Sequence, residues 1–188
     1  NSPRALAPRG RVAARPEWLI DAWLDMLPPR QAGTLSVLHR AGYPVIAAHF
    51  DHNLRPDSGA DAETVKQTAA RLKIDMVFES GDVQGYAERE KLSIEEAARN
   101  SRYRFLMDQA RRFKAQAVAV GHTADDQVET VLMHFLRGAG LAGLKGMTHR
   151  TLLPLFDPEI PIIRPLLDTW REETLVYCGV NSLHPRHD

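Results

Sequence analysis

Ala119-Val120-Gly121-His122-Thr123-Ala124-Asp125-Asp126-Gln127-Val128-Glu129-Thr130 is the stretch that decides the fold, because an apolar run turns directly into a helical pattern. Residues 116–120 are rich in Ala and Val, which predicts a buried strand. Thr123 fits a helix N-cap, with Asp126 three residues on in the capping-box position. An apolar helical face follows, made by Val128, Val131, Leu132 and Phe135. We expect this face to pack inward.

The opposite face of the same helix is polar. At about 100° per residue, His122, Asp126 and Glu129 fall within roughly 60° of one another. A strand that leads straight into a helix places this face at the carboxyl end of a parallel sheet, where α/β proteins bind ligands. Two carboxylates and an imidazole there can hold a cationic amine or a metal ion. The alternative is an ordinary capped helix start with solvated acids.

Strands and helices alternate along the rest of the chain. Strands are predicted at 44–50, 74–79 and 161–163, and helices at 17–27, 62–72, 93–113 and 170–177. This alternation predicts an α/β fold, a doubly wound, mostly parallel sheet with helices on both faces. The join at residues 31–42 is unusual. It predicts the end of a helix at Gly42, yet nothing before it looks long enough to supply the helix start or a preceding strand.

The length and composition of the chain are typical of a single domain, and its net charge indicates no particular binding partner. The chain has 188 residues, 24 basic and 24 acidic side chains, and a single cysteine, Cys178. Zero net charge gives no overall field for nucleic acid or membrane, although basic residues can still act locally. A lone cysteine excludes an intramolecular disulfide and fits a reduced, cytoplasmic compartment. Residues 1–15 carry four arginines and no acid, which predicts a disordered basic leader, with a targeting peptide as the alternative.

Further candidate site residues follow two other predicted strands and lie on one long helix. His49, Asp51 and His52 form a polar cluster where the strand at 44–50 ends, and Arg164 follows the strand at 161–163. The helix at 93–113 carries arginines on its outer faces, namely Arg99, Arg102, Arg104, Arg111 and Arg112. This basic surface can serve an anion or be merely solvated.

Four stretches in order resemble the PP-loop ATP pyrophosphatases, specifically the tRNA(Ile)-lysidine synthases. They are 48–55 (AHFDHNLR), 94–106 (IEEAARNSRYRFL), 121–130 (GHTADDQVET) with 137–140 (RGAG), and 163–167 (IRPLL). The resemblance spans residues 36–177 and implies a domain over 16–178. It also implies that the tail at 179–188 leads into a tRNA-binding part.

The resemblance also implies an activity and its residues. Such enzymes use ATP, with Mg²⁺, to adenylate the wobble cytidine of tRNA(Ile) with a CAU anticodon. L-lysine then displaces AMP to give lysidine. Asp126 and Glu129 match lysine-gripping positions, with His122 as the orienting group or proton acceptor and Arg102 at the phosphates. The resemblance places His49, Asp51, His52 and Arg164 around the nucleotide, identifies no metal ligand, and leaves a homodimer open.

One departure from the family is large. The signature S-G-G-x-D-S loop, which wraps pyrophosphate with backbone N–H groups, is absent, and residues 33–36 mark where it belongs. Either a stretch of about 20 residues is lacking there, or the loop is deleted and the chain is a catalytically inactive paralogue that binds nucleotide or tRNA. A third interpretation is that the chain is another PP-loop enzyme that modifies tRNA. A thiolase commonly needs paired cysteines, which a lone Cys178 does not supply.

Overall fold

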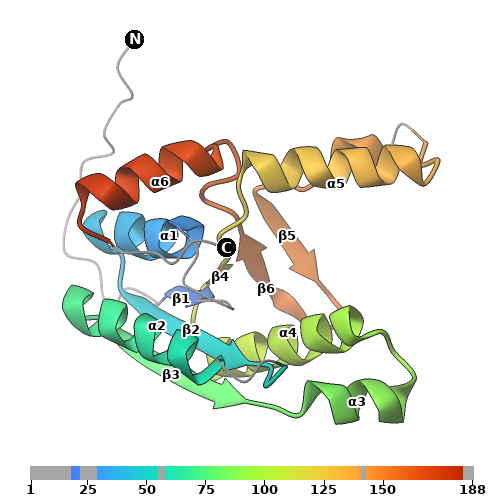
Figure 1. The fold of residues 1–188 in the computed structure, drawn as a ribbon, viewed down its shortest axis with the longest axis horizontal. Helices are drawn as coiled ribbons and strands as arrows, with labels where there is room; N and C mark the ends of the chain where they lie inside the picture. The colour runs from blue at the N-terminus through green and yellow to red at the C-terminus, as the bar shows by residue number, and fades with distance from the viewer. Residues whose placement is uncertain (1–17, 22–28, 55–57, 141–142, 184–188) are drawn as a thin grey trace.

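The computed structural model describes residues 18–21, 29–54, 58–140 and 143–183, and the described strands form a six-stranded sheet (Figure 1). Its strand order is β3-β2-β1-β4-β6-β5, and all neighbouring pairs are parallel except β5 with β6. The strands are β1 Trp18–Asp21, β2 Val45–Asp51, β3 Asp75–Ser80, β4 Val118–Ala119, β5 Arg150–Leu153 and β6 Asp157–Ile163. The prediction of a mostly parallel sheet is therefore confirmed.

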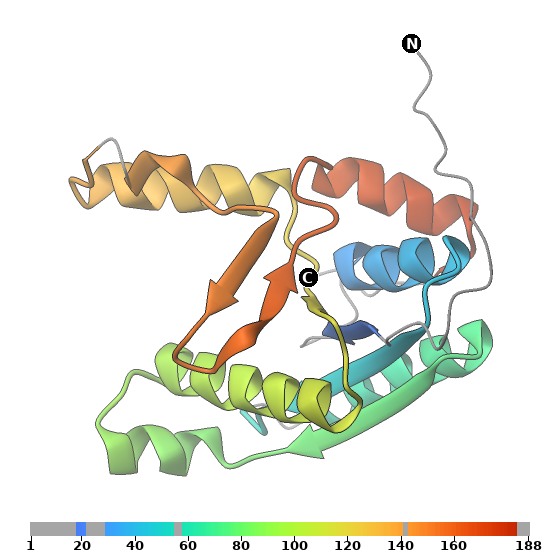
Figure 2. The ribbon, with the colours of Figure 1, turned by 180° about the vertical axis from the view of Figure 1, so that it is seen from behind.

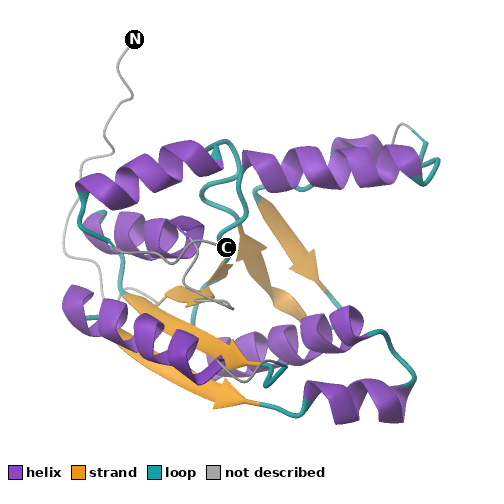
Figure 3. Cartoon of the chain, viewed as in Figure 1, coloured by secondary structure: helices purple, strands orange, loops and turns teal. Residues whose placement is uncertain are grey.

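Helices cover both faces of this sheet, as Figures 2 and 3 show from opposite sides. They are α1 Pro29–Arg40, α2 Ser58–Leu72, α3 Val83–Glu90, α4 Ile94–Arg112, α5 Ala124–Leu136, the short 3-10 helix η1 Gly143–Lys145, and α6 Arg171–Val180. α3 and α4 pack on one face, and α1, α2 and α6 pack on the other. The doubly wound α/β class is confirmed.

Strand β2 shows why its sequence is apolar almost throughout. Val45 and Ala47 pack in the core beneath α1 and α2, while Ile46, Ala48 and Phe50 pack in the core beneath α4. All seven residues of β2 are buried, because helices cover both faces of the sheet. Its last residues, which carry the candidate site, are therefore held rigidly.

The predicted helix over residues 17–27 is wrong where the structure describes it. Residues 18–21 form β1, which pairs with β2 on one side and β4 on the other, with Leu19 opposite both Ile46 and Val118. The three consecutive apolar residues 18–20 suit a strand inside a parallel sheet as well as they suit a helical stripe. Backbone pairing on both sides decides for the strand. Residues 22–27 of the predicted helix lie outside the described residues.

The join that follows is also resolved differently from the prediction. Helix α1 begins at Pro29, a favoured first helical residue, and ends at Arg40. Gly42 follows in the left-handed region at φ +79°, so the predicted helix end is confirmed. Both the helix start and a preceding strand exist, contrary to expectation, and β1 is a central strand of the sheet. Residues 22–28 between them lie outside the described part of the chain, as do residues 1–15 of the predicted leader.

The apolar face of α5 does not pack inward as expected. Val128, Leu132 and Phe135 expose 45%, 54% and 65% of their surface, and α5 has no buried residue. Figure 1 shows the reason, since α5 begins beside the start of α6 and runs outward instead of lying across the sheet. No helix in the described part of the chain, α5 included, is long and apolar enough to span a bilayer.

Candidate active site at the carboxyl edge of the sheet

Strands β2, β4 and β6 end at one edge of the sheet, because they run parallel with β1 between β2 and β4. Asp51 and His52 lie at the end of β2, residues 121–123 follow β4, and Arg164 follows β6. The expected gathering of polar segments at one edge is therefore present. In an open parallel sheet this edge is the usual position of a ligand site.

The residues at the end of β2 are almost closed off from solvent. His49 is 2% exposed and stacks on Phe78 of β3, with ring centroids 5.7 Å apart. His52 is 3% exposed and lies edge-on to Phe50. The Asp51 carboxylate accepts the backbone N–H of Asn53 at 2.9 Å, which fixes the turn after the strand. These buried side chains therefore support the carboxyl edge from within and expose little surface to a ligand.

The start of α5 combines a helix cap with the predicted acids. Asp126 Oδ2 accepts the backbone N–H of Thr123 at 2.7 Å and its hydroxyl at 2.9 Å. Thr123 is fully buried, whereas Asp126 is half-buried and Glu129, one turn further, is exposed. The capping function of Asp126 is therefore confirmed, and it occupies one carboxylate oxygen. His122 directly precedes the cap and is half-buried.

Asp125 has a function that the sequence analysis missed. Its Oδ2 accepts the backbone N–H of Arg171, the first residue of α6, at 2.7 Å. The N–H of Ala124 donates to the carbonyl oxygen of Thr169 at 3.0 Å. The amino termini of α5 and α6 are thus joined, and an acid at this position also offsets their positive dipole ends. The pair of adjacent Asp residues indicates the start of a helix. It does not indicate that one of them binds Arg171, which lies 46 residues away in the sequence.

Arginines gather around the buried ring of Tyr103 on α4. The guanidinium carbon of Arg99 lies 5.0 Å and that of Arg102 4.9 Å from the ring centroid. Arg102 is 4% exposed, so it does not belong to the solvated basic surface that the sequence suggested, whereas Arg99 remains exposed. The spacing of Arg99 and Arg102, with Tyr103 directly after them, is the sequence feature that could have identified Arg99 as a neighbour of Arg102.

Arg164 reaches the same region from the end of β6. It is 6% exposed and its Nη1 donates to the Thr148 carbonyl oxygen at 2.8 Å and the Thr151 hydroxyl at 2.9 Å. Burial lowers the pKa of Arg164, and the nearby charge of Arg99 lowers it further, while Tyr103 acts in the opposite direction. Its Nε has no hydrogen-bond partner. A buried guanidinium with only neutral acceptors favours an anion nearby.

Metal ligands are sparse at this edge. Among the described residues, no three His, Cys, Asp or Glu side chains lie together as a metal site. The chemistry available from the chain is therefore that of guanidinium groups, carboxylates and imidazoles. A metal ion that kept several waters and bound mainly to phosphates would fit such a site, since Mg²⁺ often needs only one or two carboxylates.

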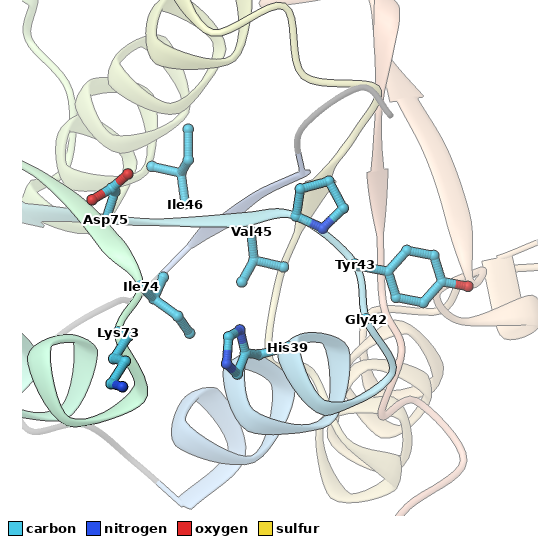
Figure 4. Close-up of a pocket in the computed structure, with 9 residues that line it drawn as sticks. His39, Gly42, Tyr43, Val45, Ile46, Lys73, Ile74 and Asp75 are labelled. Carbon is cyan, nitrogen blue, oxygen red and sulfur yellow. The ribbon is translucent and has the colours of Figure 1, made fainter. Parts of the chain in front are cut away.

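A cavity of about 590 Å³ lies at the other end of the sheet, where β2 and β3 begin (Figure 4). Its lining includes His39, Tyr43, Val45, Lys73 and Asp75. None of the predicted site residues lines it. The cavity and the candidate site are therefore separate features.

The fold and the polar carboxyl edge define a doubly wound α/β domain of the ligand-binding class. A family model described as a PP-loop domain matches residues 32–188, and the chain belongs to that family. The resemblance identified from the four motifs is thereby confirmed.

Two curated relatives of this chain share the name tRNA(Ile)-lysidine synthase. The chain is 39% identical over 171 residues to the tRNA(Ile)-lysidine synthase of Dehalococcoides mccartyi (strain CBDB1), which covers 85% of this chain and 35% of the relative. It is 38% identical over 145 residues to the enzyme of that name in Clostridioides difficile (strain 630), covering 77% of this chain and 30% of the relative. The chain thus spans about a third of the length of these relatives.

Solved structures with similar folds have distant sequences. The U34-tRNA thiolase NcsA from Methanococcus maripaludis superposes with a TM-score of 0.69 at 14% identity, covering 90% of this chain and 58% of the thiolase. NMN synthetase from Francisella tularensis gives a TM-score of 0.58 at 12% identity, covering 89% of this chain and 62% of the synthetase. At such identities the likeness concerns the fold alone.

Proposed function

We propose that the chain is the ATP-using domain of a tRNA(Ile)-lysidine synthase. In the first step the C2 oxygen of the wobble cytidine attacks the α-phosphorus of ATP, and pyrophosphate leaves. In the second, the neutral ε-amine of L-lysine attacks C2, AMP leaves with the oxygen, and the new C–N bond loses one proton from nitrogen. The relatives' printed name and the family match support this assignment, and tRNA, lysine and ATP are its three substrates.

The observation that carries the proposal is the pair of acids on α5 beside the carboxyl edge. Asp126 and Glu129 lie one helical turn apart, so both carboxylates can face one ammonium group. Lysine arrives protonated but attacks only as the neutral amine, so the reaction needs a proton acceptor. His122, at the start of the same helix, is the proposed acceptor, because its ordinary pKa lies close to neutrality.

The arginines supply the opposite charge. We expect Arg102 and Arg164, both buried and near Tyr103, to hold phosphate oxygens or the charge that develops as pyrophosphate and then AMP leave. We assign Arg99 to the same group. His49, Asp51 and His52 shape the wall of the nucleotide site in this proposal. Mg²⁺, where bound, would shield the phosphates, with Asp51 as the carboxylate available at the strand end.

The missing phosphate loop supports a second candidate. Residues 22–32, which join β1 to the first turn of α1, contain no glycine, and the first glycine after β1 is Gly33 inside α1. A loop that wraps pyrophosphate with backbone N–H groups depends on glycine for close approach. The second candidate is therefore a catalytically inactive PP-loop paralogue that still binds nucleotide or tRNA.

A tRNA thiolase is disfavoured by the state of the only cysteine in the sequence. Cys178 is fully buried on α6, and burial raises its pKa to about 11. Thiolate is the reactive form of cysteine, so this side chain is unsuited to sulfur transfer.

The test is lysidine formation by the 188-residue chain with ATP, lysine and tRNA(Ile) bearing a CAU anticodon, read by mass spectrometry of the tRNA and by AMP release. We expect Glu129→Gln to slow lysine-dependent AMP release by about 100-fold or more, and Glu172→Gln, an exposed acid on α6, to leave it unchanged. Arg102→Ala should lower turnover more than lysine affinity. Binding of ATP without any AMP release would favour the inactive paralogue, and unchanged lysine affinity in Glu129→Gln would remove that residue from the amine site.

A further inference from the structure

A short segment connects the two halves of the candidate site. It consists of residues 146–151 (GMTHRT), runs from η1 into the start of β5, and is called here the bridging segment. In Figure 2 the chain passes alongside α5 before it enters β5. One end of the segment is bonded to α5, which carries the proposed lysine-binding acids, and the other end is bonded to Arg164.

The bond to α5 is made by the side chain of Gln127. Its Oε1 accepts the backbone N–H of Met147 at 2.6 Å, and its Nε2 donates to the carbonyl oxygen of Met147 at 2.9 Å. One amide thereby binds both backbone polar groups of one residue, which fixes the position and the rotation of that residue. Gln127 is half-buried and directly follows Asp126, about 100° further round the helix. The amide and the acid therefore occupy different faces of the same helical turn.

Gly146 permits this close contact. Its φ of +65° lies in the left-handed region that favours glycine. A Cβ at Gly146 would lie 2.6 Å from Oε1 and 2.8 Å from Cδ of Gln127. Any side chain at position 146 would therefore displace the Gln127 amide from Met147.

The other end of the bridging segment holds Arg164 by both its backbone and its side chain. The backbone N–H of Arg164 donates to the carbonyl oxygen of His149 at 2.8 Å, in addition to the two bonds of its Nη1. The Thr148 hydroxyl donates to the carbonyl oxygen of Arg150 at 2.8 Å and lies 2.9 Å from the Thr151 hydroxyl. Since the Thr148 proton is used, the Thr151 hydroxyl donates to Thr148 and directs its lone pairs to Arg164.

We propose that Gln127 is a positioning residue that sets, through the bridging segment, the distance between the start of α5 and the guanidinium of Arg164. The inference rests on the proposed function, in which acids on α5 hold the lysine amine and Arg164 holds phosphate oxygens. In the second step the amine attacks C2 while AMP leaves, so both groups act on one reacting centre. In the first step lysine takes no part. A misplacement of about 1 Å costs about 100-fold in rate, and here the cost falls on the second step.

The first test measures the two steps separately in single turnovers of the 188-residue chain. Gln127→Met keeps the length of the side chain and loses both bonds to Met147. We expect lysine-dependent AMP release to slow about tenfold or more at saturating lysine, and pyrophosphate release without lysine to stay within about twofold of wild type. Gln84→Met is the matched control, because Gln84 is an exposed glutamine on α3 that donates to Glu88 at 3.4 Å. Slowing of both steps equally in Gln127→Met, or of neither, would overturn the proposal.

The second test approaches the same contact from its other side. Gly146→Ala should displace the Gln127 amide and slow the second step. In the double variant with Gln127→Met the two losses should not multiply, because both changes break one contact. Losses that multiply would show that Gly146 does not act through Gln127, contrary to the proposal.

The third test concerns the end at Arg164. Thr151→Val removes an acceptor of its Nη1 and should slow both steps, whereas Thr151→Ser keeps the hydroxyl and should restore both rates. Equal rates in the valine and serine variants would show that the hydroxyl does not position Arg164, and this end of the connection would be refuted.

Hydrogen exchange read by NMR needs no turnover and separates this inference from the proposed function. Gln127→Met should speed exchange of the backbone N–H groups of Met147 and Arg164 by about tenfold, and Gln84→Met should speed neither. Faster exchange at Met147 alone would show that the connection stops before Arg164 and would overturn the proposal. If the wild-type chain forms no lysidine and Gln127→Met still speeds both N–H groups, the proposed function fails and the connection from α5 to Arg164 stands.

Discussion

Replacing Asp157 by alanine is expected to lower the free energy of unfolding by about 3–5 kcal/mol. Asp157 is 4% exposed at the start of β6 and accepts the Nε of Arg111 on α4 at 2.8 Å. It also accepts the backbone N–H groups of Glu159 at 2.8 Å and Ile160 at 2.7 Å. Alanine would leave two backbone N–H donors and the Nε of Arg111 without their acceptor, and each such loss at a buried donor costs about 1–3 kcal/mol.

The matched control is Asp108→Ala, because Asp108 binds the same arginine from the surface. Its carboxylate lies 2.8 Å from Arg111 Nη1, and its side chain is 67% exposed. An exposed pair of this kind contributes only about 0.5 kcal/mol. Urea unfolding followed by far-UV circular dichroism measures both variants. Equal losses in the two variants would refute the view that burial and the backbone donors, and not the ion pair itself, determine the cost.

The same site predicts a pH dependence. Burial alone would raise the pKa of Asp157, but the N–H groups of Ile160 and Glu159 and the charge of Arg111 outweigh it, so the pKa lies below its ordinary value of 3.8. A lowered carboxyl pKa contributes stability above the unfolded pKa and loses it as the pH falls through the folded value. The difference between wild type and Asp157→Ala should therefore be constant from pH 7 to 5 and shrink below about pH 4. A difference that grows on acidification would contradict this assignment.

Three further predictions concern packing, capping and reactivity. A Cβ at Gly33 would lie 2.9 Å from Thr174 Cγ2, so Gly33→Ala should destabilise the domain by about 1 kcal/mol. Thr174→Ser, which removes that methyl group, should reduce the cost when the two changes are combined, as measured by thermal unfolding. Asp125→Ala removes the acceptor of the Arg171 N–H at the start of α6 and should lower the free energy of unfolding in urea by about 1 kcal/mol. An unchanged free energy of unfolding would show that this bond does not stabilise the start of α6. Cys178, buried with a pKa raised to about 11, should react with a thiol reagent at pH 8 roughly 100-fold more slowly than in urea, and equal rates would contradict its burial.

Elements with strong local signals could be predicted from the sequence. The cap at Thr123, the apolar run of β2 and the start of the helix predicted at 93–113, where Ser93 Oγ accepts the N–H of Glu96, all depend on residues close together in the chain. The four family motifs also predicted that the polar segments following the strands lie together at one edge of the sheet. These features needed no knowledge of distant contacts.

Features that depend on distant contacts could not be predicted. Residues 18–21 have an ambiguous local pattern, and only their pairing with β2 and β4 makes them a strand. The α5 face has the spacing of a core helix, but its burial depends on whether another element covers it, which the spacing does not encode. Arg102 looks like one surface arginine among several until α4 is seen against the sheet.

The bond from Asp125 to the start of α6 makes α5 and α6 a rigid joint. If the two helices separated, the backbone N–H of Arg171 would lose its acceptor. Helix α6 in turn packs against α1, where the hydroxyl oxygens of Ser36 and Tyr177 lie 3.1 Å apart. A substrate that shifts the first turn of α5 must therefore drag α6 along. Through the contact between Ser36 and Tyr177, such a displacement would also reach α1.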